Sequence, residues 1–152
     1  VKTALATSGL PATQLLLEFT ETVLLHHSDS IIAIMHQLKR LGVQLSLDDF
    51  GTGYSSLSYL HRFPVDQLKI DRSFISGIDE HPGAVNIVTS IIQLAASLGL
   101  QSVAEGLETK AQQQTLTRLK CDFGQGYFLG HPMPASDFSE ILARNHGQLE
   151  SL

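Results

Sequence analysis

Side chains that can take part in catalysis stand at the ends of five short apolar runs in this sequence. They are Glu18, Asp48, Lys69, Glu105 and Gln125. In parallel α/β folds the loops that leave the C-terminal ends of the strands converge, and active sites form there. An isolated acid at a strand end often only caps the next helix or faces water. Five polar groups in series instead favour one shared site.

The adjacent pair Asp48-Asp49 is the most specific of these features, and it leads into the glycine-containing turn Phe50–Gly53. Two neighbouring carboxylates repel each other unless a cation lies between them. Hard oxygen ligands suit Mg²⁺ or Mn²⁺, and two such ions can hold both oxygens of a phosphoryl displacement. Glu18 and Glu105 are predicted to complete the ligand set. The simpler alternative is a turn with an Asx cap.

Two further side chains fit the same chemistry. Lys69 is predicted to offset negative charge on an attacking water or a phosphate, and Gln125 to position either of them. The combination indicates metal-assisted hydrolysis of a phosphate ester rather than nucleophilic catalysis. The single cysteine, Cys121, has no base beside it in sequence and is predicted to be a small packed residue.

The apolar runs and the segments between them predict the elements that position these groups. Predicted strands are Leu15–Phe19, Val43–Leu47, Gln67–Ile70, Gln101–Ala104 and Phe123–Leu129. Helical periodicity predicts helices over Ser28–Leu41 and Pro82–Leu98, one capped by Thr109 and running to about Leu119, and one capped by Ser136 and running to about Arg144. This alternation is typical of a parallel sheet in an α/β fold.

Polarity within the strands favours a barrel over an open sheet. Ser46 and Asp48 share one face of the second strand, whereas Leu45 and Leu47 share the other. A polar face toward an interior and an apolar face toward helices is the pattern of a barrel. A complete (β/α)8 barrel needs about 250 residues. The 152 residues therefore predict an incomplete TIM-type barrel that lacks its first strands.

Composition narrows the partners and the compartment. A net charge of −5 and a pI of about 5.7 argue against binding of polymeric nucleic acid. No stretch reaches the roughly 18 apolar residues of a membrane span, so this segment is predicted to make no membrane contact. A lone cysteine fits a reducing compartment, here the cytoplasm. The opening Val1-Lys2-Thr3 has neither a signal peptide nor an initiator methionine, which predicts a chain cut from a longer parent.

Five consecutive motifs resemble those of the EAL domain family. They are Leu-Glu-Phe-Thr-Glu at 17–21, Leu-Asp-Asp-Phe-Gly-Thr-Gly-Tyr-Ser-Ser-Leu at 47–57, Phe-Pro-Val-Asp-Gln-Leu-Lys-Ile-Asp at 63–71, Ala-Glu-Gly-Leu-Glu-Thr at 104–109 and Cys-Asp-Phe-Gly-Gln-Gly-Tyr at 121–127. Order and spacing also match, from about Leu10 to Phe138. Residues 1–152 are therefore identified as a partial EAL domain.

The resemblance implies a TIM-type barrel that hydrolyses cyclic-di-GMP to linear pGpG with two Mg²⁺ or Mn²⁺ ions, in bacterial second-messenger signalling. The implied roles are metal ligands for Glu18, Asp48, Asp49 and Glu105, catalysis for Lys69, Glu105 and Gln125, substrate binding for Asp71, and support of the loop Phe50–Leu57 for Glu21 and Glu108. In the family this loop couples metal binding to dimerisation, so a homodimer is expected. Ca²⁺ is expected to inhibit because its longer bonds misplace the attacking water.

One departure from the family pattern is plain. The Glu-Ala-Leu sequence that names the family is absent, as is the asparagine ligand of the following strand. Both are expected upstream of Val1, in a longer parent protein. The parent is expected to be active, and upstream segments could tether it to a membrane. The isolated chain is expected to be inactive. The alternatives are an EAL-like domain that only binds cyclic-di-GMP or a protein partner, and an unrelated barrel such as a metal-dependent aldolase or an enolase-type enzyme.

Overall fold

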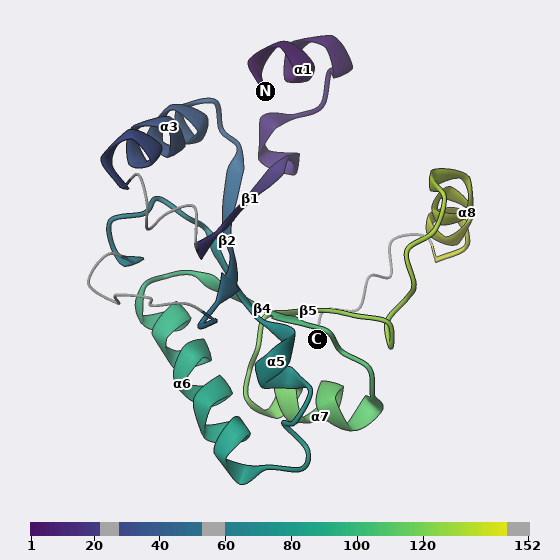
Figure 1. The fold of residues 1–152 in the computed structure, drawn as a ribbon. Coiled ribbons are helices and arrows are strands. Elements are labelled where there is room, and N and C mark those ends of the chain that lie inside the picture. Colours follow the sequence, from purple (N-terminus) through teal and green to yellow (C-terminus); the bar gives the residue numbers. More distant parts are fainter. Residues whose placement is uncertain (22–27, 53–59, 146–152) are drawn as a thin grey trace.

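Five parallel strands form a single sheet in the part of the chain that the structure, a computed structural model, describes: residues 1–21, 28–52 and 60–145. They are β1 (Leu16–Thr20), β2 (Gln44–Phe50), β3 (Gln67–Ile70), β4 (Gln101–Glu105) and β5 (Phe123–Gln125). Strands consecutive in sequence are also neighbours in space, in the order β1-β2-β3-β4-β5 (Figure 1). The fold is therefore α/β of the TIM-barrel type, as predicted, and β1 and β5 form the two edges of this sheet.

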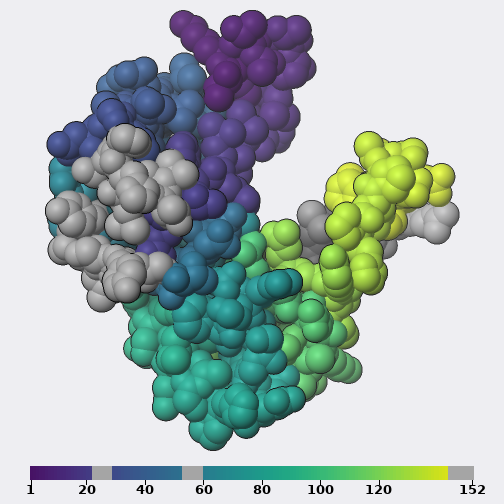
Figure 2. Space-filling model, viewed as in Figure 1, coloured from purple at the N-terminus to yellow at the C-terminus, as the bar shows by residue number. Residues whose placement is uncertain are grey.

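Helices connect the strands and cover one face of the sheet. They are α1 (Lys2–Ser8), the short 3-10 turn η1 (Ala12–Gln14), α3 (Ser28–Arg40), α5 (Arg72–Ile75), α6 (Pro82–Ser97), α7 (Lys110–Arg118) and α8 (Ala135–Asn145). In Figure 1, α3, α6 and α7 lie near the sheet, whereas α8 stands apart from it. The space-filling view shows the N-terminal residues and α8 projecting from the body, with open space between them (Figure 2). None of the helices in these described ranges is long and apolar enough to cross a membrane.

The two faces of the strands have the polarity that the alternation predicted. The helix-facing side chains Leu45, Leu47, Leu68 and Ile70 are almost fully buried and belong to the hydrophobic core together with residues of α6 such as Val88. The strand residues between them are polar and point to the other face. Burial of one face against helices thus directs the polar side chains of the strands toward a shared interior.

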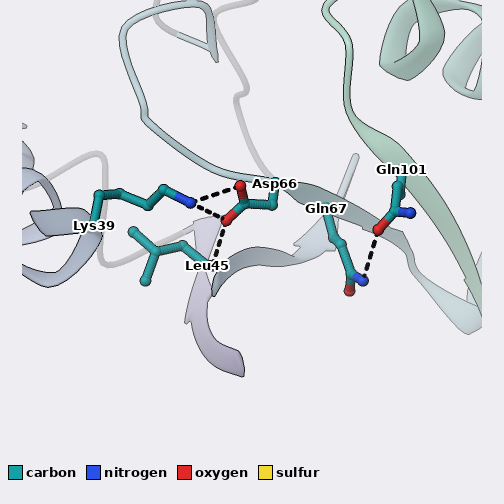
Figure 3. A network of polar contacts seen from close by, with 5 residues as sticks. All are labelled: Lys39, Leu45, Asp66, Gln67 and Gln101. Carbon is teal, nitrogen blue, oxygen red and sulfur yellow. Dashed lines mark hydrogen bonds and ion pairs between the residues drawn. The ribbon is translucent and has the colours of Figure 1, made fainter. Parts of the chain in front are cut away.

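Two aspartates tie neighbouring strands together at the end opposite their C-termini. Asp66 precedes β3, accepts a hydrogen bond from the backbone N–H of Leu45 on β2 (2.8 Å) and forms an ion pair with Lys39 of α3 (2.7 Å; Figure 3). Asp122 precedes β5 and accepts from both the N–H and the hydroxyl of Ser102 on β4, each at 2.8 Å. Each carboxylate therefore fixes the alignment of one strand against its neighbour.

Three sequence predictions about element boundaries are wrong. The last strand ends at Gln125 and not at Leu129, because the chain turns there and the N–H of Phe128 donates to Leu107 O (2.9 Å). The second strand continues to Phe50 and not only to Leu47, so the aspartate pair lies inside it. The last helix begins at Ala135, which places Ser136 in its first turn and not at its cap.

Other elements follow the local rules that predicted them. Thr109 forms a full capping box with Gln112 at the start of α7. The helix predicted from Ser28 ends at Arg40, followed by Gly42 in the left-handed region at φ 88°. The short helices α1 and α5 carry too little periodicity to be predicted from the sequence.

Candidate functional site

Lys69 is the centre of a cluster of charged side chains at the C-terminal ends of the strands. Its Nζ lies 3.0 Å from Glu18 Oε1 on β1, 3.0 Å from Asp48 Oδ1 on β2 and 2.7 Å from Glu105 Oε1 on β4. Lys69 is only 5% exposed, whereas the Glu18 side chain is 45% exposed and those of Asp48 and Glu105 about 20%. One buried ammonium therefore binds three carboxylates from three strands.

The protonation states of this cluster follow from those contacts. Burial acts to lower the pKa of Lys69, but hydrogen bonds to Glu105, Glu18 and Asp48 outweigh it and hold the pKa above its ordinary value. Burial raises the pKa of Glu105, and Lys69 only partly offsets that shift. Lys69 therefore stays cationic at neutral pH, and Glu105 holds a proton more readily than an exposed glutamate does.

Asp49 lies beside the cluster because the end of β2 is irregular. The pairing of β2 with β3 shifts register between Leu47 and Phe50, and Asp49 itself has a φ of 56°, which is rare for a residue with a side chain. Burial raises the pKa of Asp49, and the neighbouring Asp48 raises it further. The bulge thus brings a second aspartate to the edge of the sheet, and it is maintained despite the repulsion of like charges.

Asp48, Asp49 and Glu105 each offer a carboxylate oxygen, and these oxygens all lie within 4.8 Å of one another. Carboxylates at this spacing suit a hard divalent cation such as Mg²⁺ or Mn²⁺. Burial is the main cause of the raised pKa values of Asp49 and Glu105, and the neighbouring carboxylates raise both of them further. The donor set of this chain therefore fits the predicted metal ions.

A pocket of about 340 Å³ opens next to these ligands. Besides Asp49 and Glu105 it is lined by Asp71, Arg72, Gly106, Glu108, Gln125, Gly126 and Tyr127. Asp71 lies just after β3, and its carboxylate accepts from Ser73 N (2.9 Å). A hydrogen bond with the Ser73 side chain is the main cause of the lowered pKa of Asp71, and the backbone N–H groups of Ser73 and Arg72 lower it further. The structure therefore brings the predicted residues Asp71, Glu108 and Gln125 to one pocket beside the carboxylate cluster.

Glu21 is placed differently, below the loop that follows β2. It is 6% exposed, and its Oε2 accepts from the N–H of Gly51 (3.1 Å). Its buried Oε1 has no hydrogen-bond partner among the residues that the structure describes. Most of the predicted dimerisation loop, residues 53–57, lies outside the described ranges, so its support by Glu108 and its part in a dimer stay predictions.

Sequence reasoning missed two residues of the pocket, Arg72 and Tyr127. Each directly follows a motif residue or lies within a motif, but nothing in the residue type alone says that it faces the site. Cys121 lies away from the site, as expected for a packed residue. It is buried just before β5, and burial raises the pKa of its thiol.

Comparison with known families identifies relatives of this arrangement. Residues 1–132 match the sequence profile of the EAL domain. The bifunctional diguanylate cyclase/cyclic di-GMP phosphodiesterase MucR of Pseudomonas aeruginosa is 48% identical over 143 residues, which is 94% of this chain and 21% of MucR. The chain thus spans about a fifth of the length of the curated relatives it matches.

Solved structures agree in fold. The PaMucR phosphodiesterase in complex with c-di-GMP has a TM-score of 0.86 at 47% identity, covering 91% of this chain and 56% of that one. The manganese and c-di-GMP complex of BlrP1 from Klebsiella pneumoniae has a TM-score of 0.77 at 34% identity, covering 82% of this chain and 32% of that one. A calcium complex of BlrP1 with the same nucleotide gives the same TM-score.

Proposed function

Because this chain belongs to the EAL domain family, we propose that residues 1–152 form part of one EAL domain. The protein that contains this domain would hydrolyse cyclic-di-GMP to linear pGpG with Mg²⁺ or Mn²⁺. The observation that carries the proposal is the cluster in which Lys69 binds Glu18, Asp48 and Glu105 at 2.7–3.0 Å. A structural lysine needs one acidic partner, whereas this one holds three carboxylates beside an open pocket.

The carboxylates have the first role in this proposal. Glu18, Asp48, Asp49 and Glu105 would hold two divalent ions. When bound, such ions supply Lewis acidity toward a phosphodiester and lower the pKa of a coordinated water. Lys69 offsets the negative charge of the carboxylates and would help to orient the attacking water. Glu105, whose pKa is raised by burial, is suited to accept the proton of that water.

The remaining predicted residues act around this centre. Gln125 at the tip of β5 would orient the water through its amide, and Asp71 would bind the substrate from the adjoining pocket. Glu21 holds the N–H of Gly51 and would thereby support the loop over residues 50–57, with Glu108 acting on the same region. This loop is the proposed homodimer contact. The activity is proposed for the cytoplasm, the reducing compartment that the lone cysteine favours.

Calcium provides a separate expectation. Ca²⁺ takes the same oxygen ligands as Mg²⁺ but at longer and less regular distances. The three carboxylate oxygens of Asp48, Asp49 and Glu105 can therefore hold Ca²⁺ while the water is misplaced. We propose that Ca²⁺ inhibits turnover without preventing nucleotide binding.

The test uses the full-length protein with cyclic-di-GMP and chromatographic detection of pGpG. Product is expected with Mn²⁺ or Mg²⁺, and none with excess chelator or with Ca²⁺. The variant Asp49→Asn is expected to lose turnover, whereas Asp137→Asn, a matched exposed aspartate in the first turn of α8, is expected to keep it. Turnover that persists in chelator would refute metal dependence. Nucleotide binding without turnover under every metal condition would establish the receptor alternative instead.

A further inference from the structure

Gln125, the residue proposed to orient the attacking water, ends the shortest strand of the sheet. β5 comprises only Phe123–Gln125 and lies at an edge of the sheet beside β4 (Figure 1). The alignment of a strand is usually specified by the apolar side chains that it buries. None of the three residues of β5 is buried, and its one apolar side chain, Phe123, is 41% exposed. The alignment of β5 against β4 therefore depends on hydrogen bonds.

Asp122 supplies side-chain hydrogen bonds at the start of this strand. Backbone pairing of the two strands begins at Val103 and Phe123, and Asp122 extends it by one step. Its Oδ2 accepts from the N–H and from the hydroxyl of Ser102, each at 2.8 Å, and its own N–H donates to the same hydroxyl (3.1 Å). Ser102 is fully buried. Loss of the carboxylate would therefore leave two buried donors without their acceptor, which is costly.

The other end of β5 is held by backbone atoms. Leu107 N–H donates to Gln125 O (3.1 Å), and Phe128 N–H donates to Leu107 O (2.9 Å). These hydrogen bonds involve no side chain, so a substitution in this segment does not remove them directly. Asp122 is therefore the side chain through which the sequence specifies the alignment of the strand.

We propose that Asp122 is a positioning residue for the proposed hydrolysis, because it places the amide of Gln125 opposite Glu105. These two residues are paired across β4 and β5. Gly124 and Gly126 stand on both sides of Gln125, so no neighbouring side chain could take the place of the amide if the strand moved. Asp122 lies at the opposite end of β5 and acts only through Gln125. The inference rests on the proposed function and adds the residue that positions its amide.

The experiment is a double-mutant cycle in the full-length protein, with kcat measured for cyclic-di-GMP and Mn²⁺. Asp122→Ala is expected to lower kcat about 10²-fold, the loss that a small misplacement of a reacting group causes. Gln125→Ala is expected to lower kcat by a similar factor. Because Asp122 acts through Gln125, the double variant should be slower than Gln125→Ala by less than about threefold. Independent losses would instead multiply to about 10⁴-fold.

Two further variants separate positioning from a general loss of stability. Asp122→Asn keeps a side-chain oxygen that can accept from both donors of Ser102, so its kcat should stay within about threefold of the wild type. Val88→Ala removes buried apolar volume from α6 and lowers stability in urea unfolding, but its kcat should stay within about threefold of the wild type as well. A loss of kcat in Val88→Ala equal to that in Asp122→Ala would overturn the inference.

Hydrogen exchange gives a measurement that does not depend on turnover. In Asp122→Ala the amides of Leu107 and Phe128 are expected to exchange about tenfold faster, because their acceptors move with β5, whereas Asp122→Asn should keep the wild-type rates. Unchanged exchange in Asp122→Ala, or losses of kcat that multiply in the double variant, would overturn the inference. A wild-type protein that never cleaves cyclic-di-GMP, although Asp122→Ala speeds this exchange, would refute only the proposed hydrolysis and leave the alignment of β5 by Asp122 established.

Discussion

Replacing Lys69 by methionine is expected to strengthen metal binding while it strongly lowers turnover. The Lys69 ammonium binds Glu18, Asp48 and Glu105 at 2.7–3.0 Å, and all three are proposed metal ligands. Methionine keeps an unbranched apolar stem of similar length but removes the charge. Without a metal the three carboxylates then face one another with no cation. With a metal they are neutralised again.

The magnitude follows from the exposure of each partner. Charge-assisted hydrogen bonds contribute about 1.5–3 kcal/mol each, which applies to Asp48 and Glu105 with side chains about 20% exposed. Glu18 is 45% exposed, so its ion pair is screened and contributes less than about 1 kcal/mol. Desolvation of the ammonium offsets part of this total. The metal-free variant is therefore expected to lose about 2–4 kcal/mol of unfolding free energy.

Thermodynamic linkage converts that loss into metal affinity. If bound Mn²⁺ restores about 1–3 kcal/mol of the lost stability, the variant must bind Mn²⁺ about 5- to 150-fold more tightly than the wild type does. Urea unfolding with and without Mn²⁺, together with a calorimetric Mn²⁺ titration, measures both sides of the cycle. Turnover of cyclic-di-GMP is expected to fall on the order of 10²-fold or more.

The matched control is Lys39→Met, which removes the ammonium that binds Asp66 at the opposite end of the sheet. This variant is expected to lose some stability but to keep the Mn²⁺ affinity of the wild type. Weaker or unchanged Mn²⁺ binding in Lys69→Met would show that the lysine does not share its carboxylates with a metal. A turnover within tenfold of the wild type would remove Lys69 from the catalytic set.

Three further outcomes are expected. Asp48→Asn removes one negative charge from the proposed metal ligands, and kcat measured with Mn²⁺ should fall on the order of 10³-fold. A loss below tenfold would make Asp48 structural. Gly126→Ala forces a Cβ into the Leu107 backbone and should lower the free energy of unfolding in urea by about 1–3 kcal/mol or more. Gly130→Ala, with open space around the glycine, should lower it by less than about 1 kcal/mol. Equal losses in the two variants would contradict the packing of Gly126 against Leu107. Asp71→Asn should be less stable than the wild type near neutral pH. The lowered pKa of Asp71 means that its ionised form stabilises the folded state. The difference in stability should therefore be fully present above the ordinary pKa of 3.8 and disappear as pH falls through the lower folded-state pKa. It should be absent at every pH if Asp71 is not held by Ser73.

The cluster could be predicted from the sequence because strand ends in a parallel sheet lie at a common edge. Glu18, Asp48, Lys69 and Glu105 each lie in or directly after a predicted apolar strand, toward its C-terminal end, so their convergence needs only the strand order. The position of Asp49 could not be predicted in the same way. It depends on a bulge and a positive φ, and neither of these can be predicted from the presence of an aspartate.

Predicting the pocket from the sequence would have required knowledge of contacts between loops that are distant in sequence. Arg72 lies over Gly106, and Tyr127 is brought in by the fit of Gly126 against Leu107. A glycine in a sequence predicts conformational freedom but not which chain segment comes close to it. The early end of β5 has the same cause, because the N–H of Phe128 bonds to Leu107 and not to a neighbouring strand.

The aspartates at the far end of the strands have a consequence for catalysis. Asp66 holds the start of β3 against Leu45 of β2, and side chains alternate between the faces along each strand. A slip of β3 by one residue would turn Lys69 toward the helices and place Leu68 or Ile70 among the carboxylates. The hydrogen bond of Asp66 thus determines which side chains of β3 meet the carboxylates at the C-terminal edge of the sheet. Substitution of Asp66 is then expected to impair the proposed hydrolysis by misaligning the strands, although Asp66 lies outside the proposed site.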